Sequence, residues 1–291
     1  MDVVESTSDV FNKVLDWKGQ HGRVAFVPTM GNLHAGHLSL VEKARGLADK
    51  VVVSIYVNPM QFGAGEDFDT YPRTLDADKK ALIEAGVDLL FLPSNETMYP
   101  GPSANSTVSA QVYVPELSEI LCGAGRPSHF LGVTTIVNKF FNIVQPDVAI
   151  FGQKDFQQVA IIRRMVSDLF MPVEIVALPT TRESDGLAMS SRNQYLTENE
   201  RNKASLLSEL LSQMSETVAN GADIASIEAK GAEILVLSGF EPEYFSFRDP
   251  VSLSQLTHAQ KDMVVLVAAK LGSTRLIDNR LFSCETLSNS A

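Results

Sequence analysis

Short apolar runs alternate with helical patterns along the first 178 residues of the 291-residue chain. We expect strands at 23–27, 51–57, 89–92, 148–151 and 173–177, and helices at 36–48, 75–85, 130–144 and 156–169. The run at 51–57, VVVSIYV, is apolar almost throughout, which is typical of a parallel strand covered on both faces. This alternation predicts an open parallel α/β sheet with right-handed crossovers.

The pattern changes after residue 178, where we place a domain boundary. Thr197 followed three residues later by Glu200 is a capping-box signature, and we expect the polar amphipathic helix that it opens to run to about Val218. The other elements expected here are a helix at 224–237 and strands at 263–268 and 275–277. The sequence therefore predicts an α/β domain over 1–178 and a smaller α+β domain over 179–291.

Composition indicates a globular protein: 45% of the residues are hydrophobic, and 24 Lys and Arg against 35 Asp and Glu give a net charge of −11. No apolar run approaches the roughly 18 residues of a membrane helix. The acidic N-terminal segment lacks the apolar core of a signal peptide. Two distant cysteines, Cys122 and Cys284, suit a reducing compartment. An acidic chain without basic blocks is a poor candidate for binding duplex nucleic acid. We therefore expect a cytoplasmic protein without membrane or nucleic-acid partners.

The segment PTMGNLHAGH at 28–37 lies between the first expected strand and the first expected helix. Its His34 and His37 are three residues apart, so at the start of a helix they lie on one side. Gly31 and Gly36 allow the backbone to approach a ligand closely, and a helix N-terminus presents N–H groups to an anion. Two imidazoles placed there can donate hydrogen bonds to phosphate oxygens. The alternative is a pair of ordinary turn histidines.

Four further strings carry polar side chains: NPMQFG at 58–63, YPRT at 71–74, GQKDFQQ at 152–158 and DGLAMSSRN at 185–193. The histidine segment resembles the HIGH-type signature of the nucleotidylyltransferase and class I aminoacyl-tRNA synthetase superfamily. Together with the four strings, in order over residues 23–200, it resembles the pantothenate synthetase (pantoate–β-alanine ligase) family. An RLIDN string at 275–279 extends the resemblance into the C-terminal third.

The resemblance implies a Rossmann-like nucleotidyltransferase domain with a smaller α+β C-terminal lid domain, in a homodimer. It also implies a two-step reaction. (R)-Pantoate attacks the α-phosphorus of MgATP to give pantoyl adenylate and pyrophosphate, and the amine of β-alanine then displaces AMP to give pantothenate. Because the attack places charge on the α-phosphate and the leaving pyrophosphate, the site needs positioned donors and a metal more than a nucleophilic side chain.

The same resemblance implies three sets of site residues. The catalytic set is His34, His37, Lys154, Ser190, Ser191 and Arg192, with His37 as the proton donor. The ATP-binding set is Met30, Gly31, Asn32, Leu33, His34, Ala35, Gly36, His37, Gly152, Gln153, Lys154, Asp155, Thr181, Met189, Ser190, Ser191 and Arg192. The set for pantoate and β-alanine is Asn58, Gln61, Tyr71, Arg126 and Gln158, of which the neutral amides can donate to hydroxyl and carboxylate oxygens.

Several assignments stay open at this point. Asp76 and Asp78 are expected to mark a solvent-exposed helix face. Some relatives carry an acidic residue, associated with the metal, where this chain has Ala77, so the protein ligands of Mg²⁺ are undetermined. His129 either approaches the substrates or serves as a packing or capping group. Two other hypotheses are an adenylyltransferase of another small acid and an idle nucleotide-binding scaffold, which the intact chemical side chains disfavour.

Overall fold

The computed structural model describes residues 1–101 and 110–284. The chain divides into two compact units. The first consists of Met1–Gly152 and Ile161–Pro179, and the second of Gln153–Ala160 and Thr180–Ala291. The second unit thus takes in a short segment, 153–160, that interrupts the first unit in sequence.

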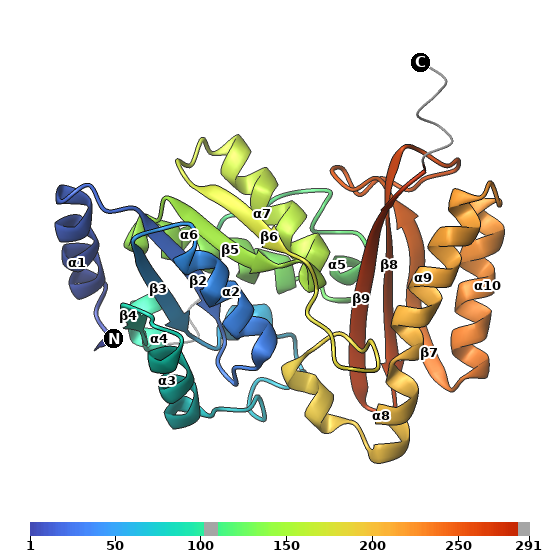
Figure 1. The fold of residues 1–291 in the computed structure, drawn as a ribbon, viewed down its shortest axis with the longest axis horizontal. Helices are drawn as coiled ribbons and strands as arrows, with labels where there is room; N and C mark the ends of the chain where they lie inside the picture. The colour runs from blue at the N-terminus through green and yellow to red at the C-terminus, as the bar shows by residue number, and fades with distance from the viewer. Residues whose placement is uncertain (102–109, 285–291) are drawn as a thin grey trace. The chain divides into compact units, whose positions relative to one another are not determined.

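Within the described residues, the first unit holds a six-stranded parallel sheet in the order β1-β4-β3-β2-β5-β6 (Figure 1). The strands are β1 (Asp2–Val4), β2 (Val24–Thr29), β3 (Lys50–Ile55), β4 (Leu89–Phe91), β5 (Val148–Gly152) and β6 (Glu174–Leu178). The strand order reverses between β2 and β5. In open α/β sheets, ligands bind outside the carboxyl ends of the strands at such a switch point.

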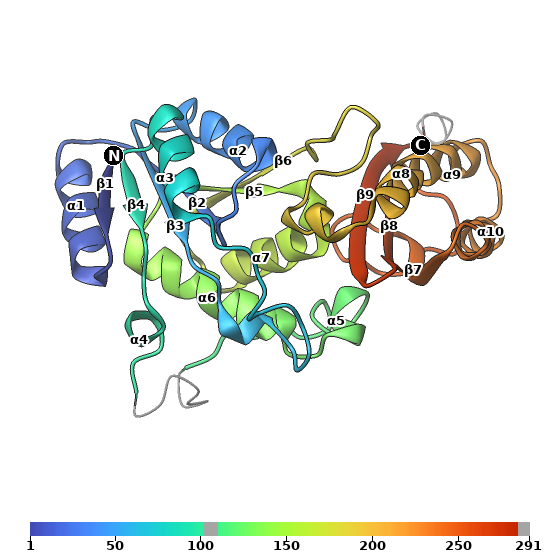
Figure 2. The ribbon, with the colours of Figure 1, turned by 90° about the horizontal axis from the view of Figure 1, so that it is seen from below.

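Helices cover both faces of this sheet. Alternate side chains of a strand point to opposite faces, and those of β2 are apolar on both. Ala25 and Val27 of β2 belong to the same apolar cluster as Leu40 of α2, whereas the ring of Phe26 lies 5.5 Å from that of Phe140 of α6. Figure 2 shows α2 and α6 on opposite sides of the sheet. The helices and turns that begin in the first unit are α1 (Thr7–Gly19), α2 (Ala35–Arg45), η1 (Pro59–Gln61), α3 (Leu75–Glu84), α4 (Asn95–Met98), α5 (Cys122–Gly125) and α6 (His129–Val144).

In the described part of the second unit, the antiparallel strands β7 (Phe240–Arg248), β8 (Asp262–Leu271) and β9 (Thr274–Ser283) form a three-stranded sheet. Leu207, Leu211 and Met214 of α9 share one apolar core with the sheet. The other elements that begin in this unit are η2 (Gln153–Asp155), α7 (Phe156–Asp168), η3 (Ser191–Tyr195), α8 (Glu198–Ala204), α9 (Leu206–Ala219) and α10 (Ile224–Leu237). No helix in the described residues is long and apolar enough to cross a membrane.

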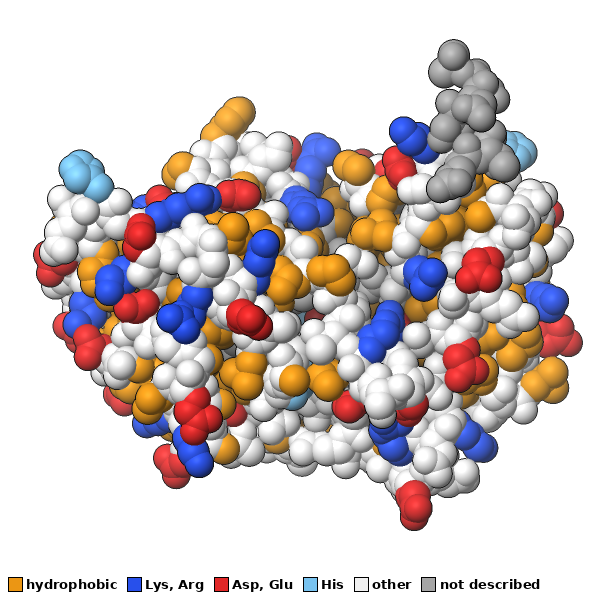
Figure 3. All heavy atoms as spheres, viewed as in Figure 1, with side chains coloured by type: hydrophobic (Ala, Val, Ile, Leu, Met, Phe, Trp, Pro, Cys, Tyr) orange, Lys and Arg blue, Asp and Glu red, His pale blue; other side chains and the backbone are white. Residues whose placement is uncertain are grey.

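The predicted fold class, a Rossmann-like parallel sheet with a smaller α+β part, is confirmed. The single helix expected from Thr197 to Val218 is wrong in one respect, because α8 and α9 are separated at Ser205. The capping box of Thr197 and Glu200 is present at the start of α8. On the face drawn in Figure 3, basic and acidic side chains are interspersed.

Candidate functional site

A buried aspartate of α3 holds the loop between β2 and α2. The Asp78 carboxylate is 3% exposed and accepts hydrogen bonds from the backbone N–H groups of Asn32 (2.9 Å) and Leu33 (2.8 Å) and from the Thr74 hydroxyl (3.1 Å). Gly31 has φ +82°, and a Cβ there would lie 3.1 Å from the carboxylate. The expectation that Asp78 faces solvent is therefore wrong, since the loop's N–H groups satisfy it inside the protein.

The two histidines of this loop cap α2 reciprocally. His34 is the N-cap residue, and its Nδ1 accepts from the backbone N–H of Gly36 at 3.2 Å. Nδ1 of His37 accepts from the backbone N–H of His34 at 3.3 Å, and the two ring centroids lie 4.1 Å apart. An imidazole nitrogen accepts a hydrogen bond only when it carries no proton. Nδ1 of each ring is therefore used inside the cap of α2.

Asn58 orients Gln61 just after β3. Asn58 is fully buried, and its Oδ1 accepts from the Tyr99 hydroxyl at 2.7 Å and from the backbone N–H of Met60 at 3.4 Å. Its Nδ2 donates to the Gly132 carbonyl oxygen at 3.1 Å and to Gln61 Oε1 at 3.0 Å. With Oε1 used in this way, the amide of Gln61 offers its Nε2 donors. Nε2 has no hydrogen-bond partner among the residues that the structure describes.

Gly132 of α6 allows this arrangement because the helix and η1 lie backbone to backbone. A Cβ on Gly132 would lie 2.3 Å from the carbonyl oxygen of Met60 and 2.7 Å from the backbone nitrogen of Gln61. Any larger residue would push η1 away. The role of Gly132 could not be predicted from the sequence, because nothing in the local pattern shows which backbone approaches it. Burial raises the pKa of Tyr99 despite its bond to Asn58, so its hydroxyl keeps the proton that it donates.

Arg126 and His129 both bind the backbone of η1. The Arg126 guanidinium forms a bidentate pair with Glu66 at 2.6 and 2.5 Å and donates to the Gln61 carbonyl oxygen at 3.1 Å. His129 Nδ1 lies 2.8 Å from the same oxygen. Burial raises the pKa of Glu66, but the hydrogen bond and charge of Arg126 outweigh burial and leave the pKa lowered. In this structure Arg126 and His129 both hold the backbone of the segment that carries Gln61. Tyr71 is buried, with its ring packed edge-on against another aromatic ring at 6.0 Å.

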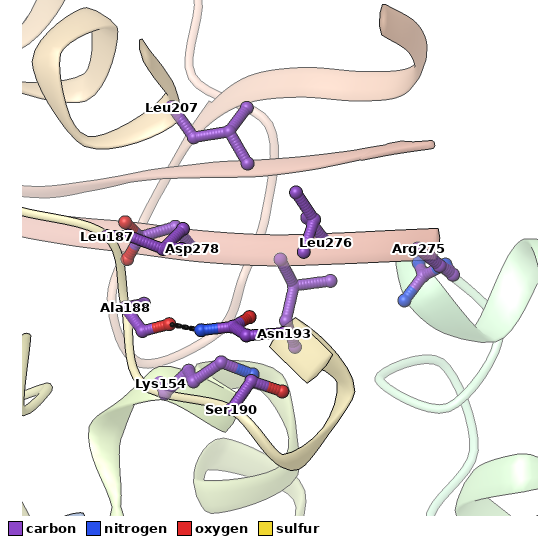
Figure 4. Close-up of a pocket in the computed structure, with 10 residues that line it drawn as sticks. Lys154, Leu187, Ala188, Ser190, Asn193, Leu207, Arg275, Leu276 and Asp278 are labelled. Carbon is purple, nitrogen blue, oxygen red and sulfur yellow. Dashed lines mark hydrogen bonds between the residues drawn. The ribbon is translucent and has the colours of Figure 1, made fainter. Parts of the chain in front are cut away.

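In the second unit, a turn and a loop carry the remaining predicted residues. Lys154 lies on η2, which Asn279 of β9 binds through two backbone carbonyl oxygens. Ser190 is the N-cap of η3, and its Oγ accepts from the backbone N–H of Arg192 at 3.2 Å. The backbone N–H of Met189 donates to the Thr181 carbonyl oxygen. A pocket is lined by Lys154, Leu187, Ala188, Ser190, Asn193, Leu207, Arg275, Leu276, Ile277 and Asp278 (Figure 4).

The predicted residues therefore form two groups. The first unit holds Met30 to His37, Asn58, Gln61, Tyr71, Arg126 and Gly152, and the second holds Gln153 to Asp155, Gln158, Thr181 and Met189 to Arg192. Gln158 is half-buried on α7, and its side chain has no hydrogen-bond partner among the described residues. The described residues contain no group of three His, Cys, Asp or Glu side chains that could hold a metal ion.

Comparison with known proteins decides the family. The family model described as Pantoate-beta-alanine ligase matches residues 2–281. The chain belongs to this family. It is 53% identical over 280 residues to the pantothenate synthetase of Shewanella pealeana, a match that covers 96% of this chain and 98% of that protein. The pantothenate synthetase of Stutzerimonas stutzeri is 51% identical over 98% of this chain and 99% of its own length.

A solved structure of the family gives the same result. The crystal structure of pantothenate synthetase from Thermus thermophilus matches with a TM-score of 0.89 and 43% identity over 96% of this chain and 99% of that chain. The resemblance to pantoate–β-alanine ligases inferred from the motifs is confirmed, and the chain is a ligase enzyme.

Proposed function

We propose that this chain catalyses the ATP-dependent condensation of (R)-pantoate with β-alanine to pantothenate, with pantoyl adenylate as the intermediate and AMP and pyrophosphate as the other products. The family match over residues 2–281 supports the reaction. The observation that carries the choice of acceptor is the Gln61 amide, which Asn58 holds with its donors outward. A neutral donor suits a small hydroxy acid, whereas an acceptor that bears a phosphate needs cations.

The first step places charge on the triphosphate, and the Nε2–H groups of His34 and His37 are donors of the required kind. The pair can bind phosphate through Nε2 while its Nδ1 atoms keep the cap of α2. Lys154, Ser190, Ser191 and Arg192 complete the proposed catalytic set, with His37 as the proton donor. The proposed ATP site comprises residues 30–37, 152–155, 181 and 189–192.

Pantoate and β-alanine are proposed to bind at Asn58, Gln61, Tyr71, Arg126 and Gln158. Of these, Gln61 and Gln158 contact the substrate with their amides. Asn58 and Arg126 act through the segment that holds Gln61, because their hydrogen bonds go to that segment. The proposed domains are residues 1–178, which bind ATP and pantoate, and residues 179–291, which act as a lid.

A crystal structure of the pantoate–β-alanine ligase from Francisella tularensis is described as complexed with beta-gamma ATP and beta-alanine; it has a TM-score of 0.80 and is 33% identical over 97% of each chain. We propose ATP as a substrate of this chain as well. The described side chains do not form a metal site of their own, so Mg²⁺ is proposed to enter on the ATP phosphates. Both cysteines are free, which supports a reducing cytoplasm. A homodimer is proposed from the family resemblance, and light scattering after size exclusion tests it.

Pantoate-dependent exchange of pyrophosphate into ATP, measured without β-alanine, tests the proposal. The wild-type protein should catalyse the exchange, and His37→Ala or Lys154→Ala should slow it by about 10²–10³-fold, as for the loss of one preorganised donor. His258→Ala, at an exposed histidine of the second unit, is the matched control and should leave it unchanged. Exchange that does not depend on pantoate would overturn the proposed acceptor. Variants that exchange normally but fail only with amine would show that these residues act on the other step.

A further inference from the structure

We infer that Asn279 of β9 is a positioning residue that fixes the backbone turn carrying Lys154, an inference that rests on the proposed function of Lys154. Asn279 belongs to the RLIDN string at 275–279, to which no role is assigned above. Its side chain is buried at 2% exposure. Nδ2 donates to the backbone carbonyl oxygens of Gln153 and Lys154, each at 2.9 Å, and Oδ1 accepts from the side-chain Nε2 of Gln153 at 3.3 Å.

These contacts fix the orientation of the turn. One amide group binds the carbonyl oxygens of two consecutive residues, so rotation of either peptide plane would break a hydrogen bond inside the protein. Because a buried polar group that loses its partner costs free energy, these hydrogen bonds hold the turn in one conformation. Asparagine is the residue that the geometry requires. An aspartate at position 279 would place a carboxylate against two carbonyl oxygens, and alanine would leave both without this donor.

The strand behind Asn279 supplies the rigidity. Asn279 pairs with Leu266 in the continuous β8–β9 ladder, and its backbone N–H donates to the Asp278 carboxylate at 2.7 Å. The same carboxylate binds the Arg182 guanidinium at 2.6 and 3.0 Å. The turn is therefore attached to a strand that is held by its ladder with β8 and by the ion pair of Asp278 with Arg182.

The backbone position of Lys154 matters because its side chain is a flexible chain of four methylene groups. Lys154 lines the same pocket as Ser190 and Asn193 (Figure 4). The reach of its ammonium group toward a phosphate depends on where Cα lies and which way Cβ points. A displacement of about 1 Å in a positioning element can cost about 10²-fold in rate.

A double-mutant cycle tests this role in the full-length chain. Asn279→Ala should slow pantoate-dependent pyrophosphate exchange by about 10–100-fold. In a Lys154→Ala background the same substitution should slow exchange by less than about threefold, because the residue that it positions is already absent. A merely structural role would give the same fold loss in both backgrounds. Arg280→Ala, at the exposed neighbouring position on β9, is the control and should leave exchange unchanged.

A second measurement does not depend on catalysis. Amide hydrogen exchange over residues 153–156 should become faster in Asn279→Asp while the β8–β9 ladder keeps its protection. Equal protection of the turn in wild-type and variant proteins would overturn the inference, as would equal losses in the two backgrounds of the cycle. Failure of both Asn279 variants to fold would also overturn it, since Asn279 would then support the whole unit. If the wild-type protein shows no pantoate-dependent exchange, the proposed function fails, and hydrogen exchange still decides whether Asn279 holds the turn.

Discussion

Replacement of Asp78 by alanine should destabilise the first unit and loosen the loop that begins α2. The carboxylate accepts from the backbone N–H groups of Asn32 and Leu33 at 2.9 and 2.8 Å, so the substitution removes the acceptor of two backbone donors. Each lost partner of a buried polar group costs about 1–3 kcal/mol, and relief from burying a charge offsets part of the sum. We expect the free energy of unfolding to fall by about 2–4 kcal/mol at neutral pH.

The chain offers both a reporter and a control for this experiment. Its single tryptophan, Trp17, lies on α1 in the first unit, so fluorescence during urea unfolding follows that unit. Asp76→Ala removes the same side chain two positions earlier on the same helix, where it is exposed, and should change the free energy by less than about 0.5 kcal/mol. Asp78→Asn retains one acceptor oxygen and should fall between the two. In the exchange assay, Asp78→Ala should also raise the KM for ATP.

Two results would refute this reasoning. Equal urea midpoints for Asp78→Ala and Asp76→Ala would mean that the hydrogen bonds to the loop contribute nothing to stability. A destabilised Asp78→Ala with an unchanged KM for ATP would mean that the loop keeps its binding geometry without the carboxylate. Both the free energy of unfolding and the KM for ATP are needed, because a loss of stability alone would not show that Asp78 holds the loop.

Three further predictions concern the segment around η1. Asn58→Ala should raise the KM for pantoate in the exchange assay by about tenfold or more, because Gln61 loses the donor that orients it; an unchanged KM would contradict this. Burial raises the pKa of Glu66, but the hydrogen bond and charge of Arg126 outweigh burial, so the pKa is lowered in the folded protein. The pair therefore stabilises the fold above the usual pKa of 4.5, and this stabilisation is lost as the pH falls through the lowered pKa. Glu66→Gln should therefore flatten the loss of unfolding free energy below about pH 4.5, measured in urea at a series of pH values. Gly132→Ala should destabilise the protein by about 1–3 kcal/mol, because its Cβ would lie 2.3 Å from a carbonyl oxygen, whereas Gly19→Ala meets open space and should not; equal stabilities would be contrary.

The parallel sheet could be predicted because its inner strands β2 to β5 are mostly buried and apolar, as Val51 to Val53 show. The antiparallel strand β7 was not predicted, and its geometry explains why. Its register shifts between Pro242 and Tyr244, so the alternation of apolar and polar positions is interrupted inside the strand. Strand β1 was missed because its three residues are mostly exposed and begin with an aspartate, whereas the equally short β4 is a fully buried apolar run.

The reactive groups were easier to find in the sequence than the residues that hold them. His34 and His37 lie within one motif, so their proximity follows from helix geometry alone. Asp78 binds backbone groups 45 and 46 positions earlier, and Asn279 binds carbonyl oxygens 125 and 126 positions earlier. No local pattern encodes such contacts. A buried carboxylate looks the same in sequence as an exposed one, which is why Asp78 was placed on the wrong face.

Asp78, Asn58 and Asn279 have one feature in common, which explains why the residues that hold the reactive groups were harder to find than the groups themselves. Each is a polar residue at 3% exposure or less, and each directs side-chain hydrogen bonds to the segment that carries a proposed reactive or binding group. Those segments are loops and short turns, whose backbone groups regular helix and strand hydrogen bonding does not satisfy. A buried side chain that binds such groups supplies partners and geometry at once. The positions of the proposed catalytic groups are therefore set by polar residues inside the fold, before any phosphate or carboxylate is bound.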